Sequence, residues 1–195
     1  MDLAIAVPAI VFLIPIYLII AIVILFDDGW PVIFSQKRRG HNGRYFTCYK
    51  FRTMVTDAGA RLEEVLASDP EKRREWEETQ KLKDDPRLTR TGGFLRRFSL
   101  DELPQLVNII RGDMSIVGPR PIIDAEVWRY GEDIRHYDSV RPGVVGLWQI
   151  NGRNDTTYQR RVELDVEYAE NRSIGYDVSI LMKSIPVILG RRGAY

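Results

Sequence analysis

The chain has 195 residues, which is enough for one domain with a substantial core, and its net charge is +1. The charge is uneven: residues 37–52 contain basic residues and no acid, residues 57–85 are acidic, and residues 87–97 are basic again. We therefore expect phosphates or anionic lipid as partners, and no nucleic acid. The single cysteine, Cys48, excludes an internal disulfide framework, and two histidines are too few for a zinc cluster or a serine–histidine relay.

The chain begins with an unbroken apolar run over residues 3–26, long enough to cross a bilayer core of about 30 Å as a helix. It has neither the basic start nor the cleavage site of a signal peptide. Pro8 and Pro15 each remove a helical hydrogen bond. Two topologies fit: a kinked helix that spans the membrane, or a helix–break–helix that returns to the same face. The basic residues that follow the run predict a cytoplasmic location for the rest of the chain.

A β-hairpin is predicted next. Residues 32–36 and 44–52 have strand character, and Asn42-Gly43 between them is a strong hairpin signal. Trp30 suits the headgroup layer of a membrane. The basic hairpin fits either a lipid-contacting patch or a set of cations that includes a phosphate ligand, for which Lys50 is the candidate.

Residues 58–66 and 71–83 are highly charged and predict two helices, with Asp69 as the cap and Pro70 at the first position of the second helix. Their apolar faces are narrow. We expect a solvated cover or a contact between copies of the chain in a homo-oligomer, and no chemistry.

Two adjacent carboxylates, Asp101 and Glu102, follow Arg96 and Arg97 in the central stretch, residues 96–106. We expect a helix that starts here and runs to about residue 110, which places the acids near free N–H groups and the positive end of the helix dipole. Ser99 with Glu102 also fits a simple capping box, although Pro104 disturbs that register. The pair alone does not establish catalysis.

The second half of the chain adds arginines on tight loops. Arg120 lies between two prolines, and Arg141 and Arg153 lie in a loop rich in Gly and Pro, residues 140–154. Rigid arginines suit bidentate recognition of phosphate. Helices are predicted over residues 122–135, 158–169 with Asp165, and 177–189.

Together, an acid pair, clustered arginines and a membrane segment favour phosphoryl transfer with a carboxylate nucleophile and a divalent metal. No P-loop, GxGxxG or kinase motif is present. The residues alone therefore indicate a membrane-attached phosphotransferase.

Four motifs carry a family resemblance. Tyr49-Lys50-Phe51-Arg52-Thr53-Met54 is followed by Ser99-Leu100-Asp101-Glu102-Leu103-Pro104-Gln105-Leu106. Then come Gly112-Asp113-Met114-Ser115-Ile116-Val117-Gly118-Pro119-Arg120-Pro121, and finally Arg141-Pro142-Gly143 with Gln149-Ile150-Asn151-Gly152-Arg153. In this order they resemble the bacterial sugar transferases, the monotopic polyprenyl-phosphate phosphoglycosyl transferases, over nearly the whole chain.

The resemblance implies a ping-pong reaction. Asp101 attacks the sugar-linked phosphate of a UDP-sugar, UMP leaves, and polyprenyl (undecaprenyl) phosphate takes the phosphosugar from the aspartate. It assigns Glu102 to assist, Mg²⁺ to bridge the diphosphate near Asp101, and a set of cations to contact phosphate or uridine, with Asp165 orienting one of them. The cations are Arg120, Arg153, Arg96 and Lys50, to which the loop reading adds Arg141.

The resemblance also implies an α+β, mostly helical fold with a re-entrant membrane helix over residues 1–26, broken near Pro15, and a domain over residues 27–195 on the cytoplasmic face of the bacterial inner membrane. Ile14 stands where family members often carry Ser. The charged insert and the Arg-Gly-Ala-Tyr ending resemble larger members, so we expect a catalytic piece of a longer protein.

The implied role is the first membrane step of surface polysaccharide synthesis. A membrane-tethered scaffold and a hydrolase of lipid-linked diphosphates are the rival hypotheses. Neither the sugar nor the pathway follows from the sequence.

Overall fold

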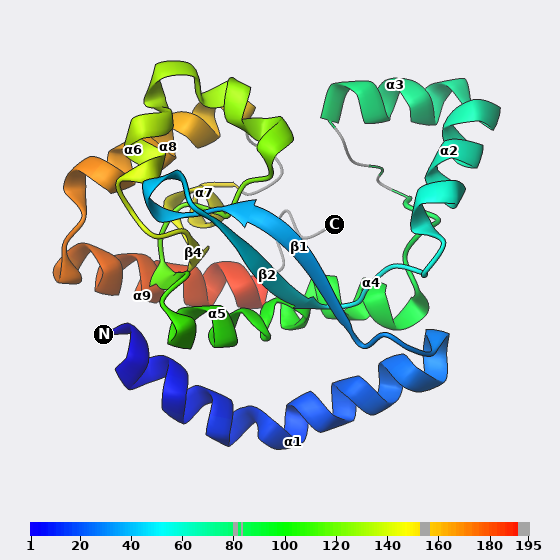
Figure 1. Ribbon diagram of the computed structural model, residues 1–195, viewed down its shortest axis with the longest axis horizontal. Coiled ribbons are helices and arrows are strands. Elements are labelled where there is room, and N and C mark those ends of the chain that lie inside the picture. Colours follow the sequence, from blue (N-terminus) through cyan, green and yellow to red (C-terminus); the bar gives the residue numbers. More distant parts are fainter. Residues whose placement is uncertain (80–81, 83, 153–156, 191–195) are drawn as a thin grey trace.

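The computed structural model describes the whole chain apart from residues 80–81, 83, 153–156 and 191–195. Within that part, helices surround two small two-stranded sheets, and one long helix lies beneath them (Figure 1). The mostly helical α+β prediction is confirmed.

The first element, α1 (Asp2–Asp28), is long and apolar enough to cross a membrane, and only 11% of its most apolar window is buried. A break at Pro15 was expected, but the helix is continuous through Pro8 and Pro15, and Figure 1 shows it bowed. A proline removes one helical hydrogen bond and bends the axis, and its neighbours can still remain helical. The predicted break is therefore replaced by a curve.

Both ends of α1 are bound to the same folded body. At the start, Asp2 Oδ1 accepts hydrogen bonds from Ser115 Oγ at 3.1 Å and from the Ile116 N–H at 3.3 Å. At the far end, Asp27 Oδ2 accepts from the Thr91 N–H at 2.9 Å. The outer side of the helix is exposed, as Phe12 at 82% shows.

A buried arginine closes the end of α1. The Arg52 guanidinium pairs with the Asp28 carboxylate and donates to three backbone carbonyls, those of Asp28 at 2.9 Å, Gly29 at 2.5 Å and Pro31 at 2.6 Å. These carbonyls at and beyond the helix end are thereby satisfied by a cation, which also complements the helix dipole.

The predicted hairpin is confirmed. Strand β1 (Ile33–Arg39) pairs antiparallel with β2 (Tyr45–Phe51), and the connection is a short 3₁₀ turn, η1 (His41–Gly43). Asn42 (φ 56°) and Gly43 (φ 69°) take the left-handed conformation that this residue pair favours.

The charged insert forms α2 (Ala58–Ser68) and α3 (Pro70–Thr79), as predicted, and both stand away from the rest of the molecule in Figure 1. Asp69 Oδ1 accepts hydrogen bonds from the Glu71 and Lys72 N–H groups at 3.0 and 3.1 Å. The predicted cap is therefore present. The second helix was predicted to run to residue 83, and as described it ends at Thr79.

The main core surrounds a second sheet, which the sequence analysis did not predict. Strand β3 (Ser115–Val117) pairs in parallel with β4 (Gly143–Val145), and the approach is so close that a Cβ on Gly143 would lie 2.1 Å from the Gly118 nitrogen. The helices around this sheet are α5 (Gln105–Arg111), α7 (Leu147–Ile150), α8 (Tyr158–Asn171) and α9 (Ile174–Gly190). The last two contain the helices predicted over residues 158–169 and 177–189.

The helix predicted over residues 122–135 is wrong in type. A 3₁₀ segment, η3 (Asp124–Asp133), contains a kink at Gly131 (φ 51°) and is followed by the short helix α6 (Ile134–Asp138). A glycine with positive φ cannot continue a right-handed helix, and this explains the interruption.

Candidate active site

The acid pair lies in a turn between two helices. Helix α4 (Arg90–Arg97) ends before Ser99, which is left-handed (φ 55°) and makes no side-chain cap bond. The 3₁₀ turn η2 (Leu100–Glu102) follows, and Pro104 immediately precedes α5. The predicted helix start and the Ser99 capping box are therefore wrong. Pro104 has no N–H to donate, so it fits at the start of α5 and would disrupt a helix begun earlier.

Cations and carboxylates alternate around this turn. Lys50 Nζ lies 3.6 Å from Asp101 Oδ2 and 2.6 Å from Glu102 Oε1. Arg120 Nη1 lies 3.4 Å from the same Glu102 oxygen. Four of the predicted site residues, Lys50, Asp101, Glu102 and Arg120, are thus brought together from β2, η2 and the segment after β3.

Asp101 is the more buried acid, with 7% of the residue exposed. Burial raises its pKa and the Glu102 carboxylate raises it further, against the lowering effect of Lys50, Arg96 and Arg120. The ionised form of Asp101 therefore depends on the cations around it.

The predicted residue Arg96 also faces Asp101. It is on α4, and its Nε donates to Thr53 Oγ1 at 3.0 Å. Burial lowers the pKa of Arg96, and the charge of Asp101 opposes this effect. Gly92 allows the close approach of α4, because a Cβ there would lie 1.9 Å from the Thr53 carbonyl oxygen.

A buried amide holds Lys50 in register with the acids. Asn108 on α5 is fully buried; its Oδ1 accepts from the Tyr49 N–H at 3.1 Å and its Nδ2 donates to the Thr47 carbonyl at 2.7 Å. The side chain thus pairs with the edge of β2 as a neighbouring strand would. Strand β2, which carries Lys50, is fixed to the helix that follows the dyad.

A small pocket opens beside the dyad. Its lining comes from both sheets, α5 and α7, and consists of Arg38, Cys48, Lys50, Glu102, Gln105, Arg120, Pro121, Gly143, Val144 and Gln149. Three of these side chains are cationic and one is a carboxylate. An anion suits such a lining.

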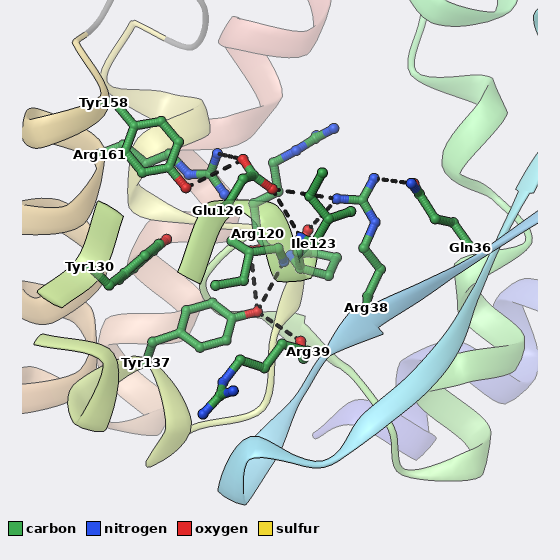
Figure 2. A network of polar contacts seen from close by, with 12 residues as sticks. Gln36, Arg38, Arg39, Arg120, Ile123, Glu126, Tyr130, Tyr137, Tyr158 and Arg161 are labelled. Atoms are coloured by element: carbon green, nitrogen blue, oxygen red, sulfur yellow. Dashed lines mark hydrogen bonds and ion pairs between the residues drawn. The ribbon is translucent and has the colours of Figure 1, made fainter. Parts of the chain in front are cut away.

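Arg38, which the sequence analysis did not single out, also lines this pocket. Figure 2 shows its side chain extending from β1, with Gln36 and Glu126 among its partners. Its Nη1 donates to the Pro121 carbonyl at 3.0 Å and lies 3.8 Å from Glu126 Oε2. Its Nη2 donates to Gln36 Oε1 at 2.7 Å. The guanidinium is thus fixed on three sides.

Glu126 links Arg38 to the interior, as Figure 2 shows. It accepts hydrogen bonds from the Ile123 N–H at 3.0 Å, and from Arg161 Nη1 and the Tyr158 hydroxyl at 3.3 Å each. Burial raises the pKa of Glu126, but the positive charges of Arg161 and Arg38 and the hydrogen bond from the Ile123 N–H hold it below its usual range.

Arg161 supports the pocket on a second side. Its guanidinium lies 5.2 Å from the Trp148 ring centre, and that of Arg120 lies 5.7 Å from the same ring. Arg161 Nε and Nη2 are buried without a hydrogen-bond acceptor, so the aromatic faces of Trp148 and Tyr158 supply the remaining stabilisation. Arg161 therefore supports both Arg38 and Arg120.

Asp165 lies behind the pocket. It is 2% exposed, its Oδ2 accepts from the Tyr130 hydroxyl at 2.7 Å, and Arg161 Nε is 3.9 Å away. Burial raises its pKa to about 6. Asp165 does lie against an arginine, but that arginine is Arg161 and not one of the predicted phosphate ligands. Asp165 itself does not line the pocket, so its predicted place among the phosphate-binding residues is wrong.

The structure describes one of the two remaining predicted arginines. Arg141 is exposed and does not line the pocket. Arg153 lies outside the described residues.

Comparison with known protein families identifies the family to which the chain belongs. The model of the family described as "Bacterial sugar transferase" matches residues 1–191, nearly the whole chain. The chain belongs to the bacterial sugar transferase family. Its resemblance to that family, predicted from four motifs, is confirmed.

Individual relatives agree. The sugar transferase chain is 50% identical over 194 residues to the "UDP-galactose-lipid carrier transferase" of Erwinia amylovora, covering 100% of this chain and 40% of the relative. It is 51% identical over 168 residues to the "Undecaprenyl-phosphate galactose phosphotransferase" of Salmonella typhimurium, covering 86% and 35%. The "Exopolysaccharide production protein ExoY" of Sinorhizobium fredii is 46% identical, with 100% and 86% covered. The chain thus spans about two fifths of the first of these relatives.

The sugar transferase site contains residues that sequence reasoning missed, namely Arg38, Glu126 and Arg161. Arg38 stood within a run of cations whose pairing register was unknown, and Glu126 and Arg161 are 35 residues apart in the chain. The one available signal was that Arg161 and Asp165 are four residues apart in a predicted helix, a spacing that brings side chains together.

The site's fit to Mg²⁺ depends on its two carboxylates. Within the described residues, no three His, Cys, Asp or Glu side chains gather as a metal site. Asp101 and Glu102 are nevertheless adjacent, and Mg²⁺ is commonly bound by one or two carboxylates together with substrate phosphates and water. The donor set of this sugar transferase fits that mode of binding.

Proposed function

We propose that this protein transfers a hexose-1-phosphate from a UDP-sugar to polyprenyl (undecaprenyl) phosphate and releases UMP, at the first membrane step of surface polysaccharide synthesis. The observation that carries the proposal is the buried Asp101, with Glu102 beside it and Lys50, Arg96 and Arg120 around the pair. The names of the relatives, which specify lipid carriers and undecaprenyl phosphate, support the same reaction.

The first half-reaction is a displacement at phosphorus. An Asp101 carboxylate oxygen attacks the phosphorus that bears the sugar, and the bond from that phosphorus to the UMP oxygen breaks. UMP leaves with the electron pair, and a phosphosugar-aspartate remains. Lys50, Arg96 and Arg120 stabilise the charge on the phosphate oxygens during the attack.

The second half-reaction returns the enzyme to its starting state. A phosphate oxygen of the polyprenyl phosphate attacks the same phosphorus, and the Asp101 carboxylate leaves. Glu102 orients the lipid phosphate and takes its proton if that phosphate arrives as the monoanion. The product is the polyprenyl-diphospho-sugar.

Mg²⁺ is the proposed metal. Asp101 and Glu102 would hold it together with the donor diphosphate, where it supplies neutralisation of phosphate charge. Lys50 Nζ, now within 3.6 Å of both acids, would then turn toward phosphate oxygens.

We further propose that α1 is re-entrant and that the remainder, residues 27–195, lies on the cytoplasmic face of the bacterial inner membrane. Support comes from the hydrogen bonds that bind Asp2 and Asp27, at opposite ends of the helix, to one folded body. A helix that spanned the bilayer would place its two ends on opposite faces of the hydrocarbon core, which is about 30 Å thick, and one folded body could not then bind both ends.

Intact mass spectrometry tests the reaction. Detergent-purified protein is incubated with Mg²⁺ and single UDP-sugars, UDP-galactose and UDP-glucose first, without a lipid acceptor. We expect a mass gain of one phosphosugar, and Asp101→Asn should abolish it because the amide is not a nucleophile. Glu102→Gln serves as the comparison, since it keeps the nucleophile.

Three other outcomes would contradict the proposal. Sugar phosphate released to water without lipid would identify a hydrolase. An adduct that persists in Asp101→Asn would place the nucleophile elsewhere. No adduct in the wild type, and no UMP after polyprenyl phosphate is added, would favour the scaffold hypothesis.

A further inference from the structure

The Arg38 guanidinium has N–H groups that no other group of the described protein accepts. Two of its five N–H groups are used, by the Pro121 carbonyl and by Gln36. Within the described part of the chain the remaining three have no hydrogen-bond acceptor, although the guanidinium lines the pocket. A fixed guanidinium with unused N–H donors suits the binding of a phosphate.

The charges around Arg38 do not neutralise the pocket. Arg38 and Arg120 line the same pocket. Burial lowers the pKa of Arg38, and the positive charge of Arg120 lowers it further. Glu126, at 3.8 Å, is the acid paired with Arg38, and it is shared with Arg161 at 3.3 Å. Two cations placed together in one pocket are stabilised when an anion lies between them.

The order of contacts places Arg38 away from the nucleophile. Asp101 contacts Lys50, Lys50 contacts Glu102, and Glu102 contacts Arg120. Arg38 lines the same pocket as Arg120, and among the described residues its partners are Pro121, Gln36 and Glu126 and not the dyad. The phosphorus under attack must lie beside Asp101, so a second phosphorus of the donor would lie toward Arg38.

We propose that Arg38 binds the nucleotide-side phosphate of the donor, the phosphate that departs in UMP, and that Glu126 and Arg161 are positioning residues that hold Arg38 in place. This inference rests on the proposed function and adds to it the residue that anchors the leaving group. Arg161 and Arg120 also both lie over the Trp148 ring, so one buried arginine supports Arg38 through Glu126 and Arg120 through Trp148.

The test measures UMP affinity, by calorimetry and by inhibition of adduct formation, for the wild type, Arg38→Gln and Arg38→Lys. We expect Arg38→Gln to weaken UMP binding about tenfold or more, because a charge-assisted contact is lost. Arg38→Lys should recover part of the loss, since it keeps the charge without the fork. Arg44→Gln is the matched control: it removes an exposed cation from the same hairpin and should leave UMP affinity unchanged.

A double-mutant cycle tests the positioning role. Glu126→Gln alone should weaken UMP binding several-fold, and the same change in the Arg38→Gln background should have no further effect. A purely structural role of Glu126 would instead lower affinity equally in both backgrounds. Circular dichroism and the melting temperature in detergent identify variants that fail to fold, and Arg38→Lys, which keeps the charge, remains informative if Arg38→Gln does not fold.

The remaining outcomes separate this inference from the proposed function. If the wild type forms the adduct and Arg38→Gln binds UMP normally, the inference is wrong and the function stands. If Arg38→Gln slows only the transfer to polyprenyl phosphate, Arg38 binds the acceptor phosphate and the inference is again wrong. If the wild type neither forms the adduct nor binds UMP, both are overturned.

Discussion

At the scale of single residues, Asp101 and Glu102 are neighbours with different surroundings. Asp101 is nearly enclosed, and its closest cation is Lys50 at 3.6 Å, whereas Glu102 is bonded to Lys50 at 2.6 Å and paired with Arg120 at 3.4 Å. Environments that separate two carboxylates in this way typically give them separate roles. The less neutralised acid is the candidate nucleophile.

Lys50 should set the pH at which Asp101 becomes reactive. Adduct formation needs the ionised carboxylate, so its rate should rise with pH through the pKa of Asp101. Burial raises that pKa and Lys50 lowers it, so Lys50→Gln should move the acidic limb of the pH–rate profile to higher pH, by about one unit or more. The measurement is the midpoint of the limb in single-turnover mass spectrometry.

Lys37→Gln is the control for this experiment. Lys37 is on the same hairpin and lies over the Tyr45 ring at 4.9 Å, away from the dyad. An unchanged midpoint in Lys50→Gln, whatever the height of the profile, would show that Lys50 does not control the ionisation of Asp101.

Several residues of the candidate active site could be predicted from the sequence, because the two acids and the cations near them occur in long motifs. Lys50, Asp101, Glu102 and Arg120 do come together. Arg38 could not be selected, since its side of the hairpin depends on a pairing register that only the fold determines. The role of Asp165 was ambiguous for the same reason: its partner, Tyr130, is on another element.

At the scale of elements, the contact between α4 and Thr53, in the segment after β2, holds Arg96 where its charge acts on Asp101. Gly92 makes this contact feasible, since its missing side chain leaves room for the Thr53 backbone. Arg96 then reaches Thr53 Oγ1 one helical turn later. Displacement of α4 would therefore also move the Arg96 guanidinium relative to Asp101.

Gly92→Ala should destabilise the protein and slow adduct formation. The new Cβ would lie 1.9 Å from the Thr53 oxygen, so the helix must shift, at a cost of about 3 kcal/mol in the free energy of unfolding. Gly93→Ala meets nothing within 4 Å and should instead stabilise by about 0.5–1 kcal/mol, because alanine favours a helix. Denaturant unfolding in detergent compares the two. Equal stability of the two variants would contradict the close approach.

Elements with strong local signals could be predicted, and those decided by distant contacts could not. The Asn42-Gly43 turn and the Asp69 cap are local, and both are present. The sheet of β3 and β4 was missed because each strand has three residues and pairs across about 28 positions, as Ser115 does with Gly143. The start of α5 was misplaced because Ser99 adopts a left-handed conformation that its sequence does not announce.

At the scale of the whole molecule, α1 and the body form one unit. Tyr17, near the middle of α1, donates to the Leu103 carbonyl at 2.5 Å, and Ile20 and Ile24 pack with Phe51 and Leu95. The helix is therefore attached along its length as well as at both ends.

Cysteine labelling distinguishes the re-entrant topology from a spanning one. In a Cys48→Ser background, Met1→Cys (behind a new initiator) and Trp30→Cys mark the two ends of α1. We expect both to react with a membrane-impermeant maleimide in inside-out vesicles and neither to react in right-side-out vesicles. Labelling of the two ends from opposite sides would show that α1 spans the bilayer. Reaction of both sites in detergent is the control.

The attachment of α1 also connects the position of this helix in the membrane to the catalytic acid pair. Arg52, which closes the end of α1, is two residues from Lys50, which holds the acid pair. A change in the depth at which α1 rests, imposed by bilayer thickness, would be transmitted through this short piece of strand to the dyad. The turnover rate should then vary with the acyl-chain length of the surrounding lipid even when the donor and the acceptor are saturating, so that the membrane acts as an effector of the enzyme.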